Sequence, residues 1–188
     1  VLLACILITL PRFFQFIEAR NGVVLNDLLL QWMGPADLSI PLFIIIWSTT
    51  ALFIIRSLFQ PVLFLNAVYC LSFLCLVRML TIYLVPLDPP ATIIAIKDPL
   101  TSLTYGGKDV FMTKDLFFSG HTSNMLMLAL CFERKTDRWI GMVAALLVGV
   151  FVLVQHAHYT IDVVAAFFIT MVVVKFGKKI SGQSGPDV

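Results

Sequence analysis

Apolar residues along this chain form long runs that polar residues interrupt at a few places. A helix needs roughly 20 mostly apolar residues to cross the hydrocarbon core of a bilayer, and several runs reach or approach that length. The runs that predict membrane-spanning helices are residues 1–17, 40–55, 62–85, 116–132, 139–155 and 159–174. The pattern therefore predicts an all-α integral membrane bundle of about six transmembrane helices. The first run has no initiator Met, and we expect the sequence to begin inside a longer first span.

The polar stretches between these runs predict the connections. Residues 12–33 mix apolar residues with four charged ones, which predicts a segment lying in the membrane interface. Residues 87–115 form the longest polar connection, and connections of this length commonly cover a site as a lid or an entrance. No polar stretch is long enough for a separate soluble domain, so we expect a single membrane domain over 1–188, with catalytic helices over about 116–176.

The distribution of basic residues predicts the orientation of the bundle. Arg56, the cluster at 134–138 and the tail at 175–179 fall on one side of a six-span arrangement. The positive-inside rule makes that side cytoplasmic. The connection over 87–115 then belongs to the opposite, exoplasmic face, and we expect a multi-pass membrane protein whose site lies on that face.

Composition agrees with a membrane protein and argues against a soluble domain and against nucleic-acid binding. The chain is 60% hydrophobic and 13% charged, which is too apolar for a soluble domain of 188 residues. The net charge of +2 comes with basic residues that are scattered or at span ends, so no nucleic-acid partner is expected. The four cysteines lie in apolar runs without a Cys-x-x-Cys spacing, which favours buried free thiols.

His158 and Asp162 are the first candidate catalytic pair. Four residues apart, they share one face of a helix, and the carboxylate can reach the imidazole. A carboxylate that holds one ring nitrogen fixes the tautomer and leaves the other nitrogen as a nucleophile or base. Asp162 is also costly at the start of an apolar span unless it has such a partner.

The second candidate is residues 119–122, Ser-Gly-His-Thr, at the N-terminal end of the fourth apolar run. Unpaired backbone N–H groups and the helix dipole favour an anion at such an end. Gly120 allows close approach of the backbone, Ser119 and Thr122 can donate hydrogen bonds, and His121 can supply a proton. This pattern predicts a phosphate site with an acid beside it. Two helices joined by a short turn return to the same side, so His121 should lie at the depth of His158.

These residues resemble a known family. Residues 118–122 (Phe-Ser-Gly-His-Thr) and 158–163 (His-Tyr-Thr-Ile-Asp-Val) are similar to the motifs of the sphingomyelin synthase group. That group is the choline- and ethanolamine-phosphotransferase branch of the type 2 phosphatidic acid phosphatase superfamily. Asp115 also matches the motif, and residues 78–83 (Arg-Met-Leu-Thr-Ile-Tyr) are similar to one in the family's third span. The resemblance covers about residues 35–176.

The resemblance implies a six-helix membrane fold and a phosphotransfer that needs no metal and no cofactor. His158 would attack the phosphorus of a phospholipid headgroup, and Asp162 would orient it. His121 would protonate the departing diacylglycerol oxygen and then act as base on a hydroxyl such as that of ceramide, or on water. The partners implied are a phospholipid donor, a lipid acceptor or water, and the bilayer.

The substrate-binding set that we expect around the phosphate is larger than the two motifs. Its members are Ser119, Gly120, Thr122, Asp115, Arg78, Lys114 and Tyr159. The Lys and Arg-Pro pattern and the Ser-Arg pair of ordinary lipid phosphatases are absent, so Arg78 or Lys114 has to neutralise the phosphate. The synthases have Cys-Gly before the aspartate where this chain has Thr113-Lys114, which leaves the headgroup open.

Two other interpretations of the same residues stay open. A lipid phosphatase or phospholipase C-type hydrolase would use the same His, His and Asp set with water as acceptor. A non-catalytic scaffold or transporter would line a pathway with these polar groups. A metal site would draw on all three histidines, but no carboxylate or Cys cluster completes a ligand set, so none is expected. His156 is interpreted as a structural or supporting residue.

Overall fold

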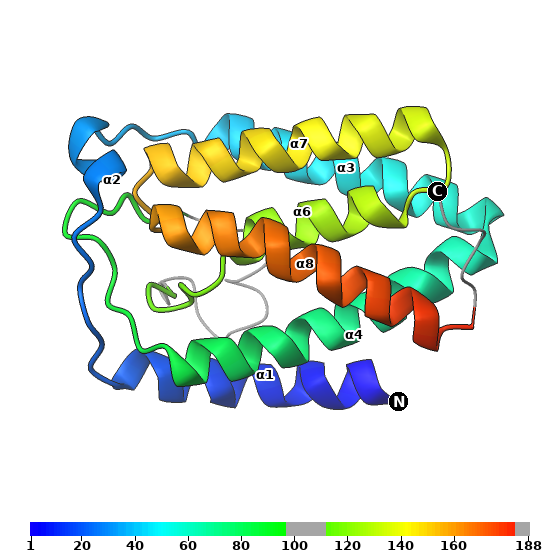
Figure 1. The fold of residues 1–188 in the computed structure, drawn as a ribbon, viewed down its shortest axis with the longest axis horizontal. Helices are drawn as coiled ribbons and strands as arrows, with labels where there is room; N and C mark the ends of the chain where they lie inside the picture. Colours follow the sequence, from blue (N-terminus) through cyan, green and yellow to red (C-terminus); the bar gives the residue numbers. More distant parts are fainter. Residues whose placement is uncertain (97–111, 183–188) are drawn as a thin grey trace.

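The computed structural model describes residues 1–96 and 112–182, and this part of the chain is helical. The helices are α1 (Leu2–Ala19), α2 (Leu28–Trp32), α3 (Ser39–Phe59), α4 (Pro61–Leu84), α6 (Gly120–Cys131), α7 (Lys135–Val154) and α8 (Thr160–Ile180). The long helices run alongside one another, with α1 and α4 on one side, α3 and α7 on the other, and α6 and α8 between them (Figure 1). The predicted all-α bundle is therefore confirmed.

Five of these helices are long and apolar enough to span a membrane, namely α1, α3, α4, α7 and α8. The remaining predicted span, the fourth in the chain at 116–132, is helical only from Gly120 to Cys131, because the residues before it stay irregular. The irregular carbonyls are satisfied by side chains of α4. Thr81 Oγ1 donates to Phe117 O at 3.2 Å, and Arg78 Nε donates to Phe118 O at 3.2 Å. Non-helical backbone at membrane depth is tolerated where protein groups satisfy it in this way.

Helix α6 is the central element of the bundle. It packs against α3, α4, α7 and α8, and most of its residues are buried. Its C-terminal end is held from α8, where Lys178 Nζ donates to Leu130 O at 2.7 Å. From α7, the Arg138 guanidinium donates to Phe132 O at 3.1 and 2.9 Å. Because α6 is enclosed by other helices, its residues are placed by protein contacts rather than by lipid.

The segment from 12 to 33 is divided in the structure. Helix α1 continues through Ala19, and the rest is a connection that contains the five-residue helix α2. Its backbone pairs with the connection after α4 through a bridge between Val23 and Leu87. The connection after α1 therefore lies at the end of the bundle where α4 ends and α8 begins (Figure 1).

An ion pair joins α3 to α7 at the opposite end of the bundle. Arg56 Nε lies 2.7 Å from Asp137 Oδ2, and Arg56 Nη2 lies 3.2 Å from Asp137 Oδ1. The Asp137 side chain is only 6% exposed. A bidentate pair of this kind holds the last turn of α3 against the first turn of α7.

Replacing Arg56 with Ala is expected to lower the free energy of unfolding by about 3 kcal/mol, because the buried Asp137 carboxylate loses its partner. Thermal unfolding in detergent measures the effect. The matched double replacement, Arg56→Leu with Asp137→Leu, should recover most of the stability because it leaves no unpaired charge. An unchanged midpoint for Arg56→Ala alone would show that the pair does not hold α3 to α7.

Candidate active site

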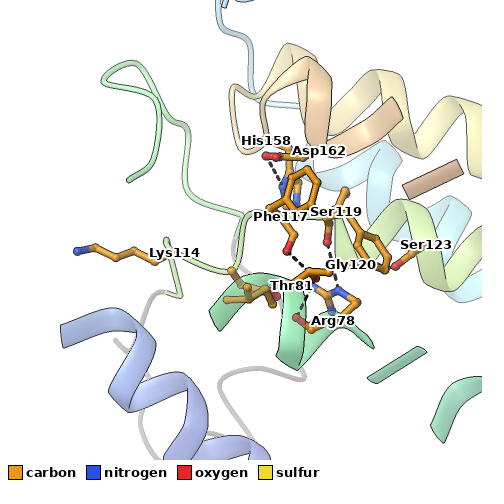
Figure 2. Close-up of polar contacts among 12 residues, drawn as sticks. Arg78, Thr81, Lys114, Phe117, Ser119, Gly120, Ser123, His158 and Asp162 are labelled. Atoms are coloured by element: carbon orange, nitrogen blue, oxygen red, sulfur yellow. Dashed lines mark hydrogen bonds and ion pairs between the residues drawn. The ribbon is translucent and has the colours of Figure 1, made fainter. Parts of the chain in front are cut away.

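His158 and Asp162 lie together at the start of α8, as their spacing predicts. His158 Nδ1 is 3.5 Å from Asp162 Oδ2, and the two side chains are 6% and 0% exposed (Figure 2). The same carboxylate oxygen accepts a hydrogen bond from Tyr159 N at 2.9 Å. Within the described residues Nδ1 has no other hydrogen-bond partner. The separation is longer than a normal hydrogen bond, as is common at catalytic pairs before substrate binds.

A backbone hydrogen bond joins the two motifs directly. Ser119 N, just before α6, donates to the carbonyl oxygen of Asp162 at 3.2 Å. Ser119 and Thr122 are fully buried, and their hydroxyl oxygens lie 3.1 Å apart. His121 is the second residue of α6 and is partly exposed. The structure therefore brings His121 to the same end of the bundle as His158.

Arg78 of α4 lies against the first residue of α6 (Figure 2). A Cβ atom built at Gly120 would come within 2.6–2.7 Å of three guanidinium atoms of Arg78, so only glycine admits this contact. Arg78 Nη2 pairs with Asp115 Oδ1 at 2.6 Å. The guanidinium and the N-terminal end of a helix both favour an anion, and here they lie at one point.

Two members of the predicted binding set, Lys114 and Tyr159, direct the polar ends of their side chains to loops. Lys114 points away from the cluster (Figure 2), and its amine pairs with Asp88 Oδ1 at 2.9 Å and donates to Arg20 O. The hydroxyl of Tyr159 donates to Asp88 O at 2.8 Å and accepts from Leu25 N at 3.2 Å. Of the two cations that the sequence offered for the phosphate, only Arg78 lies beside the second motif.

His156 is engaged by loops on both sides of its ring. Its Nδ1 is hydrogen-bonded to Thr92 Oγ1, and its Nε2 lies 3.0 Å from Met33 O. The residue is 3% exposed and has a φ of 53°. These contacts fit a structural role. Among residues 1–96 and 112–182, no three His, Cys, Asp or Glu side chains gather in a way that could hold a metal ion.

Carboxylates outside the motifs hold this end of the bundle together, and the motif comparison did not identify them. Glu18 of α1 accepts hydrogen bonds from the N–H groups of Thr113 and Lys114 at 3.2 and 3.1 Å. Asp88 accepts from Gly22 N at 3.1 Å in addition to pairing with Lys114. The one signal in the sequence was that Glu18 lies in the segment expected at the interface and Asp88 in the long polar connection.

Asp88 gives this end of the bundle a dependence on pH. The hydrogen bond from Lys114 is the main cause that holds the pKa of Asp88 below its ordinary value of 3.8; desolvation opposes this, and the bond from Gly22 adds to it. A carboxylate with a lowered folded-state pKa adds stability above its unfolded pKa and loses it as the pH falls through the folded value. Asp88→Asn is therefore expected to lower the thermal midpoint at pH 7 and to have little effect once the pH falls below the lowered folded-state pKa of Asp88.

Unfolding in detergent across this pH range measures the difference between wild type and Asp88→Asn. Lys114→Met serves as the matched variant because it removes the same ion pair from its other side. If the thermal midpoint of Asp88→Asn stayed equally far below that of wild type at the lowest pH, the ion pair would not be the cause of the difference.

Comparisons with known proteins match the region that carries both motifs. Residues 113–179 match the family described as PAP2 superfamily C-terminal. A protein of Caenorhabditis elegans named "Putative phosphatidylcholine:ceramide cholinephosphotransferase 3" is 33% identical over 75 residues, which cover 37% of this chain and 22% of that protein. The chain thus matches less than a quarter of the length of this relative. No solved structure matches the chain. The match confirms the resemblance seen in the motifs: the segment that carries His121, His158 and Asp162 is similar to the C-terminal region of the PAP2 superfamily.

Proposed function

We propose that this protein is a membrane lipid phosphotransferase, which moves a phospho-headgroup from a glycerophospholipid to a lipid hydroxyl such as that of ceramide. The observation that carries the proposal is the junction of the two motifs. Ser119 N is bonded to the backbone of Asp162, so the N-terminal end of α6 lies beside the buried pair of His158 and Asp162. A nucleophile, its supporting carboxylate and an anion site are thereby combined in one place.

We propose the following first half of the reaction. Nδ1 of His158 faces Asp162, so Nε2 is the nitrogen that attacks phosphorus. The N–P bond forms as the bond between phosphorus and the diacylglycerol oxygen breaks. His121 donates a proton to that oxygen, and diacylglycerol leaves. The imidazole of His158 gains positive charge in this step, and the carboxylate of Asp162 stabilises it.

The second half reverses these roles. His121, now neutral, accepts the proton of the acceptor hydroxyl, whose oxygen attacks phosphorus while the N–P bond breaks. His158 returns to its starting state, and no metal or cofactor takes part. Ceramide as acceptor gives a phosphosphingolipid, whereas water gives a free phosphorylated headgroup. The name of the nematode relative describes a transfer from phosphatidylcholine to ceramide, which favours the lipid acceptor.

Arg78 is the group that we assign to the phosphate. Its guanidinium already binds an anion, the Asp115 carboxylate, and lies against the first residue of α6. The Asp115 side chain is 28% exposed, compared with 14% for Arg78, so the carboxylate is the partner with freedom to turn away. A phosphate that replaced this carboxylate would receive the fork of the guanidinium and the N–H groups of the helix start.

The distribution of charge supports an exoplasmic site. The basic residues at 134–138 lie at the start of α7, and those at 175–179 lie near the C-terminal end of α8. Both groups, with Arg56 of α3, are at the end of the bundle opposite to His158 (Figure 1). Under the positive-inside rule that end is cytoplasmic, and the lipid headgroup is handled on the other face.

The proposal is tested with purified protein in detergent and phospholipid donors labelled in the phosphate, with either a choline or an ethanolamine headgroup. Label that appears in a sphingolipid only when ceramide is added supports the transferase. Release of a water-soluble labelled headgroup without ceramide indicates a hydrolase with the same residues. Absence of both products with both donors would overturn the proposed chemistry.

A further inference from the structure

Asp27, which lies outside the segment matched to the PAP2 superfamily, contacts the backbone next to His158. Its Oδ2 accepts a hydrogen bond from Thr160 N at 2.6 Å, and its Oδ1 accepts from Thr160 Oγ1 at 2.9 Å. The same Oδ1 accepts from Leu29 N at 3.0 Å and from Leu30 N at 3.3 Å. One carboxylate therefore caps the N-terminal ends of both α2 and α8.

The bond to Thr160 N matters because the first amides of a helix have no acceptor within the helix. At the start of α8, Tyr159 N is satisfied by Asp162 and Thr160 N by Asp27. Thr160 is two residues from His158. The carboxylate that supports the histidine and the carboxylate of Asp27 thus hold adjacent amides of one turn. His158 directly precedes this turn, so the two carboxylates hold the backbone next to the residue that carries the imidazole.

The connection between α1 and α3 holds the other side of His158 as well. Met33 O is bonded to the ring of His156, and Ala36 N donates to Val154 O at 3.1 Å. Ser39 at the start of α3 accepts from the Gln155 side chain at 2.9 Å. The short link between α7 and α8, on which His158 lies, is therefore held on both sides from residues 20–39.

We propose that Asp27 is a positioning residue for His158, and that the connection between α1 and α3 sets the direction of the nucleophile. This inference rests on the proposed function for the role of His158, but the contact itself does not depend on it. The hydrogen bonds also make Asp27 a stronger acid. Burial alone would raise its pKa, but the bonds from Thr160, Leu30 and Leu29 together hold the pKa below its ordinary value.

Loss of this contact is expected to change the chemical step rather than substrate binding. A misplacement of about 1 Å can cost about 100-fold in rate. Asp27→Ala is expected to lower kcat by about 10- to 100-fold and to leave KM within about twofold. Asp27→Asn keeps an acceptor oxygen for Thr160 N and should fall between wild type and Asp27→Ala. Asn26→Ala is the matched control, because the Asn26 side chain accepts only from Gln31 in the described part of the chain.

Amide hydrogen exchange of the detergent-solubilised protein provides a readout that is independent of activity. The expected result is faster exchange over residues 158–163 in Asp27→Ala, with the rest of α8 unchanged and with wild-type exchange in Asn26→Ala. Thr160→Ala removes the hydrogen bond from the Thr160 hydroxyl to Asp27. Its effect on kcat should therefore not add to that of Asp27→Asn. This pair keeps the test available if Asp27→Ala does not fold.

Unchanged exchange over 158–163 in Asp27→Asn and Asp27→Ala would overturn the inference whatever the activity. Additive effects of Asp27→Asn and Thr160→Ala on kcat would also overturn it. The same holds for a loss of kcat in Asp27→Ala that is accompanied by faster exchange throughout the protein. If the wild-type protein lacks transfer activity, and Asp27→Ala still shows faster exchange confined to 158–163, the proposed function is overturned. The structural role of Asp27 is then supported.

Discussion

Replacing His158 with Ala is expected to lower the transfer activity by a factor of about 10⁴ or more, because the replacement removes Nε2, the atom proposed to attack phosphorus. His156 cannot take over as nucleophile, since both of its ring nitrogens are engaged by Thr92 and Met33. The assay is transfer of label from phospholipid to ceramide. An acid-quenched sample should contain phosphate label on the wild-type protein and none on His158→Ala.

Two further variants separate the nucleophile from its support. Asp162→Asn keeps the shape of the side chain but loses the charge that stabilises the imidazolium, so a smaller loss of about 10²- to 10⁴-fold is expected. His121→Ala should slow both half-reactions and still allow label to accumulate on His158. Activity above about one hundredth of wild type in His158→Ala would exclude a histidine-linked intermediate at this position.

Arg78→Ala is expected to lower kcat/KM by about 10²- to 10³-fold, because the phosphate loses its charged donor. Arg78→Lys should recover only part of this, since an ammonium cannot make the two parallel bonds of a guanidinium. Lys114→Met is the matched comparison and should retain most of the activity, because Lys114 is directed to Asp88 and Arg20. The reverse ranking of Arg78→Ala and Lys114→Met would move the phosphate to the other cation.

Much of this site could be predicted because its main relations are local. His158 and Asp162 are one helical turn apart, and the pattern at 119–122 describes a helix start by itself. The two spans between the motifs return the chain to the same end. Five predicted spans agree with helices that are long enough to cross a membrane. The prediction for 116–132 was too long, since residues just before Gly120 are held by Arg78 and Thr81 from another helix.

Other parts of the site depend on contacts between residues far apart in the chain. The bonds of Asp27 to Thr160, of Glu18 to Thr113 and of Gly22 to Asp88 span 133, 95 and 66 residues. Hydrophobic periodicity reports only on neighbours within a turn or two, so it carries no information on these pairs. For the same reason the sequence offered Arg78 and Lys114 as equal candidates, and only the packing of α4 against α6 separates them.

The length of α6 has a consequence for biosynthesis. Twelve residues of helix extend about 18 Å, well short of the roughly 30 Å of a bilayer core. Its start is also polar, with Ser119, Thr122 and Ser123. Such a segment has little tendency to leave the translocon for lipid on its own. Helix α6 is therefore expected to enter the membrane together with α7, as a hairpin with basic residues at the start of α7, and a nascent chain halted before α7 should leave α6 outside the bilayer.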